Sequence, residues 1–335
     1  MAERLLDRFD AVLSDLDGVV YAGPHAIPGA PENLGRISAD GVPVVYVTNN
    51  ASRSVATVAA HLTELGVPAG PEDVVSSAQA AAVLLAERLP AGTPVLITGS
   101  QALSDVVEDA GLLPVRAQDD APRAVIQGFD PGLGWAALAE ATYTLSDPDV
   151  LWVATNTDLT IPQARGLAPG NGTLVAAVAT ATGRVPEVAG KPEAPIFRTA
   201  AGRVGSARPL VVGDRLDTDI LGGNAAGFAT VVVLTGVDTV RTVLAARAAE
   251  RPTYLVRTLD GLFEPYPGIA LAPAGAGHAA TCGAAAAETD GDVLRVRGRH
   301  EDLDAWRAAC AAWWAAHPDA RAATAPSAIE WEDGR

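Results

Sequence analysis

The chain has 335 residues, of which 49% are hydrophobic and 19% are charged. That length predicts two domains, or two domains with an appendage, and the composition supports a packed core and excludes an intrinsically disordered chain. The 40 acidic and 24 basic residues give a formal net charge of −16. This charge argues against nucleic acid and anionic membranes as partners, because both require a positive face. A small anionic substrate stays compatible if a local site overrides the overall charge.

Compartment signals point to the cytoplasm. The first residues, MAERLLDRFDAV, contain no apolar segment of the kind found in signal peptides. No run approaches the 18 consecutive apolar residues of a membrane-spanning helix. Two cysteines, Cys282 and Cys310, do not make a disulfide framework. We therefore expect a cytoplasmic protein that does not contact membranes.

Short apolar runs alternate with stretches of helical spacing along most of the chain. In chain order, the pattern predicts a strand at 9–16, a helix at 33–39, a strand at 42–48, a helix at 54–65, a strand at 95–98, a helix at 103–110, a strand at 124–127, a helix at 135–145, a strand at 150–154, helices at 173–182 and 196–204, a strand at 210–212, a helix at 220–226 and a strand at 230–234. Strands and helices alternating at this spacing form right-handed βαβ units. The predicted fold class is α/β with a parallel sheet.

The composition changes after Pro267. Residues 270–287 are mostly Ala and Gly without a clear period, which predicts a linker or a loosely ordered segment. A strand is expected at 292–296 and a helix at 301–316. Within this helix, Leu303, Trp306, Cys310 and Trp313 follow the spacing of one apolar face.

Two acidic segments follow apolar strands. Asp15 and Asp17 end the first strand in the sequence DLDGV, and the later segment GDRLDTDI contains Asp214, Asp217 and Asp219. Ligands of open α/β sheets bind at the carboxyl ends of strands, and carboxylates there suit a hard cation and phosphoryl chemistry. Taken singly, the first segment also fits a simple Asp-Gly turn, and the second also fits an acidic helix N-terminus.

Two further segments have polar or basic side chains that suit an anion. Thr48, Asn49 and Asn50 follow the second strand, where hydroxyl and N–H groups can hold phosphate oxygens or simply cap the next helix. Lys191 lies between Gly190 and Pro192 and is the only lysine among the 24 basic residues. An ammonium at a rigid turn can supply a compact positive charge to a phosphoryl group, although exposed turn lysines are common.

Together and in this order, the DLDGV, VTNN, GKP and GDRLDTDI segments resemble the four motifs of the haloacid dehalogenase superfamily of aspartate-nucleophile phosphohydrolases. The resemblance covers residues 9–265. It implies a Rossmann-like core at 1–76 and 189–265 with an inserted α/β cap of the C2 type at 77–188. The cap resembles that of the branch with 4-nitrophenylphosphatase, phosphoglycolate phosphatase and pyridoxal-phosphate phosphatase, on the segments VIQGFDP, ATNTD and PGNGTL.

The resemblance implies a role for each motif residue. Asp15 would attack phosphorus and form an aspartyl phosphate, while Asp17 would act first as general acid and then as general base. Mg²⁺, or Mn²⁺ with the same oxygen ligands, would be held by Asp15, Asp17 through its backbone carbonyl, and Asp214. The residues implied to bind or steady the phosphoryl group are Thr48, Asn49, Asn50 and Lys191. Asp219 would orient Lys191 or a water molecule.

The substrate is a small phosphorylated metabolite on this interpretation. Contacts to its leaving group are predicted for Asn50, Arg53, Asn156, Asp158 and Asn171. The short C-terminal region, 266–335, resembles that of bacterial glycerol-3-phosphate phosphatases, which is similar to a fragment of an acetyltransferase (GNAT) fold. Glycerol 3-phosphate is therefore the first expected substrate, with 2-phosphoglycolate, a sugar phosphate or pyridoxal phosphate as alternatives.

Two questions stay open in the sequence. A catalytically silent module that binds a phosphorylated ligand is a remote alternative, which Asp17 argues against because it supplies the general acid. Residues 292–335 lack the Gly-rich loop of an active acetyltransferase, so the tail is expected to pack through Trp306, Trp313 and Trp314 on the core or on a second subunit. A homo-oligomer formed through the cap or the C-terminal helix is compatible with this interpretation.

Overall fold

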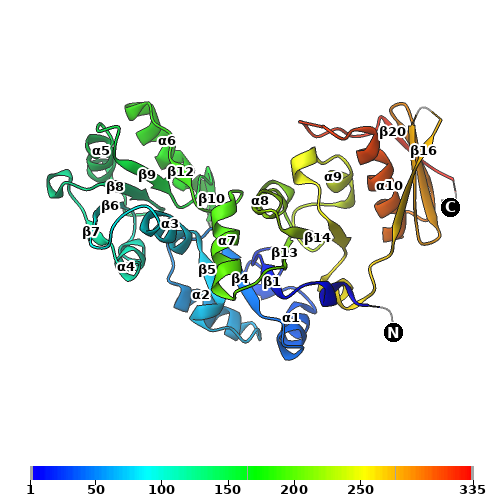
Figure 1. Cartoon of the computed structure of the whole chain (residues 1–335), viewed down its shortest axis with the longest axis horizontal. Helices are drawn as coiled ribbons and strands as arrows, with labels where there is room; N and C mark the ends of the chain where they lie inside the picture. Colours follow the sequence, from blue (N-terminus) through cyan, green and yellow to red (C-terminus); the bar gives the residue numbers. More distant parts are fainter. Residues whose placement is uncertain (1–2, 164, 276, 333–335) are drawn as a thin grey trace. The chain divides into compact units, whose positions relative to one another are not determined.

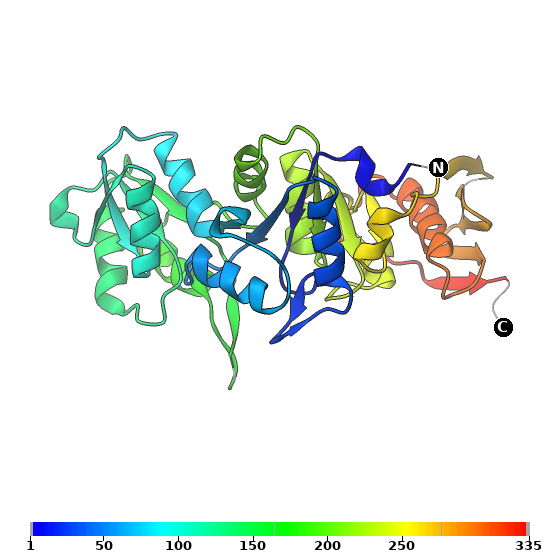
Figure 2. The same cartoon turned by 90° about the horizontal axis from the view of Figure 1, so that it is seen from below.

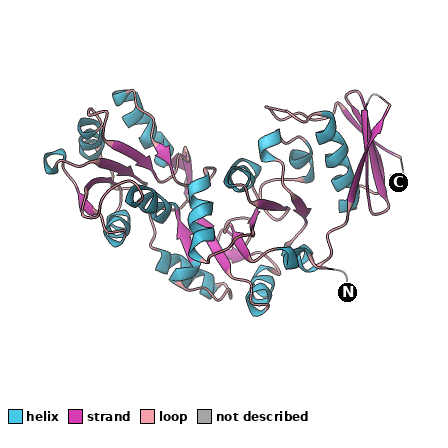
Figure 3. Ribbon diagram, viewed as in Figure 1, coloured by secondary structure: helices cyan, strands magenta, loops and turns pink. Residues whose placement is uncertain are grey.

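The computed structural model describes residues 3–163, 165–275 and 277–332, and the chain divides into two compact units. The first unit contains Met1–Val44 and Ser206–Arg335, and the second contains Val45–Gly205. Figure 1 shows the elements coloured along the chain, and Figure 3 shows helices placed beside the sheets. The predicted α/β class with parallel sheets is confirmed.

The first unit is built on a parallel sheet whose strands are almost entirely buried. The sheet runs in the order β15-β14-β13-β1. The strands are β1 (Ala11–Ser14), β13 (Pro209–Gly213), β14 (Ala229–Val233) and β15 (Tyr254–Val256). The helices and short strands of this part are α1 (Ala30–Ala39), α8 (Leu221–Ala226), α9 (Val240–Leu244), β2 (Tyr21–Ala22) and β3 (His25–Ala26). The continuous apolar runs predicted these central strands because a parallel strand is buried on both faces.

The C-terminal region of the same unit corrects one prediction. Residues 270–287 form strands rather than a linker, in a five-stranded sheet that is antiparallel except for its β19–β20 pair. Its elements are β16 (Ile269–Ala274), β17 (Gly277–Cys282), β18 (Ala285–Asp290), β19 (Val293–Arg297), β20 (Ala328–Trp331) and α10 (Leu303–Ala316). Alanines such as Ala280 and Ala287 are buried there. Their small side chains let α10 approach the sheet, but they give little hydrophobic contrast along the sequence.

Helix α10 joins this sheet to the core of the first unit. One apolar cluster contains Trp306, Trp313 and Ala280 together with Leu244 and Leu255 of the α/β part. The indole of Trp314 donates a hydrogen bond to the backbone oxygen of Leu244 at 3.1 Å. Figure 2 shows α10 beside the strands of the C-terminal sheet. The predicted packing of the tail tryptophans on the core is confirmed.

The second unit contains two groups of parallel strands. Strands β4 (Val44–Thr48) and β5 (Val74–Ser76) pair with each other, with α2 (Val55–Glu64), α3 (Ser77–Ala86) and α7 (Ala194–Arg203) in the same unit. A five-stranded parallel sheet runs in the order β12-β9-β8-β6-β7. Its strands and helices are β6 (Pro94–Thr98), β7 (Leu113–Val115), β8 (Ala124–Gln127), β9 (Leu151–Ala154), β12 (Glu187–Val188), α4 (Gln101–Asp109), α5 (Trp135–Thr144) and α6 (Asn171–Thr182).

A hairpin of β10 (Thr160–Gln163) and β11 (Gly166–Pro169) extends from this second sheet region (Figure 2). The sequence did not predict the hairpin or the α3 helix. None of the helices in the described part of the chain has the length and apolar character needed to cross a membrane. The predicted boundaries of core, cap and tail stay predictions.

Candidate active site

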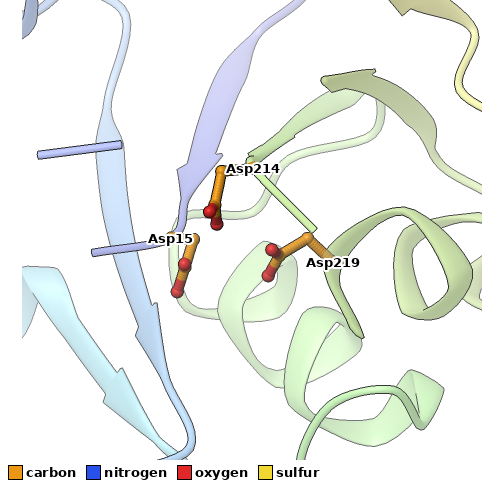
Figure 4. Close-up of side chains that lie close together, drawn as sticks. All are labelled: Asp15, Asp214 and Asp219. Carbon is orange, nitrogen blue, oxygen red and sulfur yellow. The ribbon is translucent and has the colours of Figure 1, made fainter. Parts of the chain in front are cut away.

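Three aspartates meet at the carboxyl ends of β1 and β13. Ser14 pairs with Val212 across these strands, so Asp15 and Asp214 emerge from neighbouring strand ends. Each of Asp15, Asp214 and Asp219 offers an oxygen, and these oxygens lie within 4.8 Å of one another (Figure 4). Asp214 and Asp219 are 2% and 1% exposed. Because three carboxylates at this spacing repel one another, the arrangement favours a bound divalent cation.

Backbone groups of the loop after β14 hold Asp214 in place. The Val237 N–H donates to Asp214 Oδ2 at 2.7 Å. A Cβ atom at Gly236 would overlap the Asp214 carboxylate, and so would one at Gly18, whose φ of +81° also favours glycine. Thr235 donates its hydroxyl to the Gly18 backbone oxygen at 2.6 Å, which ties this loop to the segment after Asp15. The loop therefore fixes both strand ends.

The second aspartate of the GDRLDTDI segment, Asp217, is not part of the acidic group. Asp217 accepts hydrogen bonds from the Arg215 guanidinium at 2.8 and 3.0 Å. This contact lowers the pKa of Asp217 and raises that of Arg215. The Arg215 backbone N–H donates to Asp219 Oδ2 at 3.3 Å, inside a π-helical turn spanning Leu216–Ile220. The turn separates the two carboxylates, so only Asp219 reaches the acidic group.

Asp17 lies two residues beyond Asp15, with the buried Leu16 between them. Its side chain is exposed, and it is not one of the three acidic residues grouped within the described residues. An exposed carboxylate beside the group is accessible to a substrate oxygen, as proton transfer requires.

The polar and basic motif residues meet in the second unit. Asn49 follows β4, and its Oδ1 accepts the Lys191 N–H at 2.7 Å. The Asn49 amide also donates to the Lys191 backbone oxygen at 3.0 Å and to the Asp158 carboxylate at 3.3 and 3.4 Å. Lys191 is only 5% exposed. The structure thus brings together two motifs separated by 142 positions in sequence.

Thr48 and Asn50 form a short polar turn beside Asn49. The Asn50 N–H donates to Thr48 Oγ1 at 3.1 Å, and Asn50 Oδ1 accepts the Ser52 N–H at 2.9 Å. Asn50 and Arg53 are exposed. These contacts form a local turn and are not the helix cap that the sequence also allowed, because Ser54 is the N-cap of α2 and accepts the Thr57 N–H.

The predicted cap residues differ in exposure. Asn156 and Asn171 are 5% and 1% exposed, and their amides donate to backbone oxygens. Asp158 is partly exposed and contacts Asn49. Their predicted contacts with a substrate stay predictions.

Several residues that support the motifs carry no recognisable pattern in the sequence. Thr235, Gly236 and Val237 lie in a loop without a motif signal, and only the glycine after an apolar strand hinted at a close approach. Ser77, fully buried, donates its hydroxyl to the Asn49 backbone oxygen at 2.8 Å. A serine at a helix start carries no sign of that distant acceptor.

Comparison with known proteins agrees with this geometry. Residues 12–113 match the family described as haloacid dehalogenase-like hydrolase, and residues 188–262 match a second HAD-hydrolase-like family. The chain is 44% identical over 314 residues to D-glycerol 3-phosphate phosphatase of Mycobacterium tuberculosis, covering 92% of this chain and 86% of that protein. It is 41% identical over 273 residues to glycerol-3-phosphate phosphatase of Gallus gallus, covering 75% and 88%.

A solved structure extends the similarity to the tail. The crystal structure of a glycerol phosphate phosphatase from M. tuberculosis in complex with magnesium is 41% identical, with a TM-score of 0.83. The match covers 99% of this chain and 96% of that one. Sequence, strand order and the acidic group lead to the same conclusion: the chain belongs to the haloacid dehalogenase-like hydrolases.

Proposed function

We propose that this hydrolase is a magnesium-dependent phosphatase that converts glycerol 3-phosphate to glycerol and phosphate. The observation that carries the proposal is the meeting of Asp15, Asp214 and Asp219 at adjoining strand ends. The identity to the M. tuberculosis and G. gallus glycerol phosphatases supports the choice of substrate. We also propose that the protein resides in the cytoplasm and that it self-associates through the cap or α10.

The acidic group fits a hard divalent cation. Its donors are carboxylate oxygens, and the glycine backbone around Asp214 leaves no room for larger side chains. Asp15, Asp214 and the backbone carbonyl of Asp17 would hold Mg²⁺, and Asp219 would orient groups around it. When bound, the ion neutralises phosphoryl charge, which otherwise repels an attacking carboxylate.

Asp15 is the proposed nucleophile. Its carboxylate oxygen forms a bond to phosphorus, and the bond from phosphorus to the glycerol oxygen breaks. Asp17 gives its proton to that departing oxygen, so that glycerol leaves neutral. Asp17 then takes a proton from water as the water attacks the aspartyl phosphate, which releases phosphate and restores Asp15.

The group in the second unit is proposed to bind the phosphoryl oxygens. Lys191 supplies a local positive charge for the phosphoryl group, although the net charge of the protein is −16. The Thr48 hydroxyl and the Asn49 backbone N–H are donors suited to phosphate, and the Asn50 N–H would join them by leaving Thr48 Oγ1. Asn50, Arg53 and Asp158 are the exposed or partly exposed residues offered to the glycerol hydroxyls. Exposure of these three is what keeps them available to a substrate.

Phosphate release from a panel of substrates tests the proposal. The panel contains glycerol 3-phosphate, 2-phosphoglycolate, pyridoxal phosphate, 4-nitrophenyl phosphate and several sugar phosphates, all with Mg²⁺. We expect kcat/KM for glycerol 3-phosphate to exceed the others by about tenfold, which corresponds to about 1.4 kcal/mol in the transition state. Another preferred substrate would overturn the glycerol 3-phosphate assignment but leave the phosphatase. No release from any substrate would overturn the reaction.

A further inference from the structure

The Asn49 side chain forms hydrogen bonds with both backbone polar groups of Lys191. Its Oδ1 accepts the Lys191 N–H at 2.7 Å, while its Nδ2 donates to the Lys191 backbone oxygen at 3.0 Å. A primary amide can accept and donate at once, so one side chain satisfies both groups. A Cβ atom at Gly190 would lie 2.4 Å from the Thr155 backbone oxygen and 2.6 Å from Asn49 Oδ1. These two close approaches together account for the glycine in the GKP motif.

The main chain of Asn49 is held in turn from the cap segment. The Asn49 backbone oxygen accepts the Asn156 Nδ2 and the Ser77 Oγ, each at 2.8 Å. Asn156 follows β9, and its own backbone oxygen accepts Asn171 Nδ2 at 2.7 Å. Asn156 Oδ1 accepts the Asp158 N–H at 3.2 Å. A continuous path of hydrogen bonds thus runs from the start of α6 through Asn156 and Asn49 to Lys191.

The bonds of the two asparagines distinguish them from substrate contacts. Asn171 and Asn156 are 1% and 5% exposed, and the amide of each already donates to a backbone oxygen. Buried amides that already bond to backbone oxygens fix geometry, because removing a buried partner leaves an unsatisfied group at substantial cost. The charge of Lys191 is useful to a phosphoryl group only if its backbone is placed correctly, since small displacements of a catalytic group cost rate.

We propose that Asn156 is a positioning residue for Lys191, acting through Asn49, and that Asn171 holds Asn156 in place. The proposal rests on the role of Lys191 in the proposed function. It assigns to two cap asparagines a task different from the substrate contacts predicted from the sequence. The essential feature of Asn156 is its N–H donor, which an aspartate of the same shape lacks.

The first test needs no activity, because Lys191 is the only lysine in the chain. Protein labelled with ¹⁵N-lysine has a single backbone amide signal, and its hydrogen-exchange rate reports on the bond to Asn49. We expect Asn156→Ala to speed that exchange by about tenfold. Asn33→Ala is the matched control, since Asn33 is 6% exposed and donates to Asp260 in the first unit. An unchanged exchange rate in Asn156→Ala would overturn the proposal.

The second test is a double-mutant cycle on kcat and KM for glycerol 3-phosphate. Asn156→Ala should lower kcat by about tenfold with little change in KM, and should lower it by less than about twofold when Lys191 is already Met. An equal loss in both backgrounds, or an effect on KM alone, would show that Asn156 acts independently of Lys191. Wild-type activity in Lys191→Met would instead refute the role given to Lys191, and the positioning proposal with it.

One further variant guards against failure to fold. Ser77→Ala removes the other donor to the Asn49 backbone oxygen, so it is also expected to speed exchange of the Lys191 amide. If Asn156→Ala is insoluble, this variant tests whether support of the Asn49 backbone oxygen controls Lys191. Asn156→Asp gives a second check on the donor, because it preserves volume and should behave like Asn156→Ala. An Asn156→Asp protein with wild-type exchange and kcat would contradict the requirement for an N–H group.

Discussion

The two groups of motif residues are built in opposite ways. In the first unit, Asp15, Asp214 and Asp219 gather three like charges, held by backbone N–H groups and by close glycines. In the second unit, neutral amides hold a single cation by its main chain. The acidic group therefore depends on a balancing charge, whereas the lysine group depends on position. The two should fail differently when altered.

The largest expected effect comes from the acidic group. Asp15→Asn keeps the shape of the side chain but removes the nucleophile, so we expect kcat to fall by about 10⁴-fold or more. Phosphate release under Mg²⁺ measures the loss, and an unchanged melting temperature shows that the fold is intact. Substantial activity in Asp15→Asn would show that another group attacks phosphorus.

Removing the cation should expose the charge repulsion directly. A chelator is expected to abolish phosphate release, and Mg²⁺ is expected to restore it and raise the melting temperature. Without metal, Asp219→Asn should raise the free energy of unfolding by about 1–3 kcal/mol because it removes one of three neighbouring negative charges. The same variant should gain less from Mg²⁺. A metal-free Asp219→Asn protein less stable than the wild type would contradict the repulsion argument.

Lys191→Arg separates charge from position in the second group. The guanidinium keeps the positive charge but is planar, bulkier and differently hydrated. We expect kcat to fall by about 10²-fold with the fold preserved, since a buried site clamped on the backbone has little room to adjust. Initial rates across Mg²⁺ concentrations check this, with Arg203→Lys at an exposed position as the control. Near wild-type turnover would mean that charge alone suffices.

The sequence was sufficient to predict the positions of Asp15, Asp214 and Lys191 at the ends of elements. Apolar runs mark buried parallel strands, and polar residues directly after such runs fall at the ligand-binding edge of the sheet. That argument needs only local pattern. It could not separate Asp217 from Asp219, because the difference lies in the π-helical turn and in the Arg215 contact.

Other features depend on partners distant in sequence. The amides of Asn156 and Asn171 could equally face a substrate or a backbone oxygen, and only the fold decides between them. The strands between Ile269 and Asp290 escaped prediction because the apolar residues of β16 are mostly exposed and the buried positions of β17 and β18 are mostly alanine, which gives little alternation of hydropathy. Their place is set by α10, which supplies the large side chains.

A substitution in the C-terminal region should affect the stability of the first unit without affecting turnover. Trp306 is 1% exposed, contacts the rings of His300 and Trp331, and belongs to the apolar cluster of the first unit. Trp306→Ala should lower the free energy of unfolding by about 3–5 kcal/mol, while kcat at 25 °C changes by less than about twofold. Denaturant unfolding and phosphate release measure the two effects.

The hydrogen-exchange rate of the Lys191 amide shows whether Trp306→Ala also destabilises the second unit. Trp306 lies in the first unit and Lys191 in the second. If the two units unfold separately, exchange at Lys191 stays at its wild-type rate in Trp306→Ala, although the first unit has become less stable. If exchange at Lys191 instead accelerates by the full loss of stability, the protein unfolds as one cooperative body. In that case the acidic group and the lysine group would respond differently to substitution in their effect on kcat, but both would be lost in the same unfolding transition.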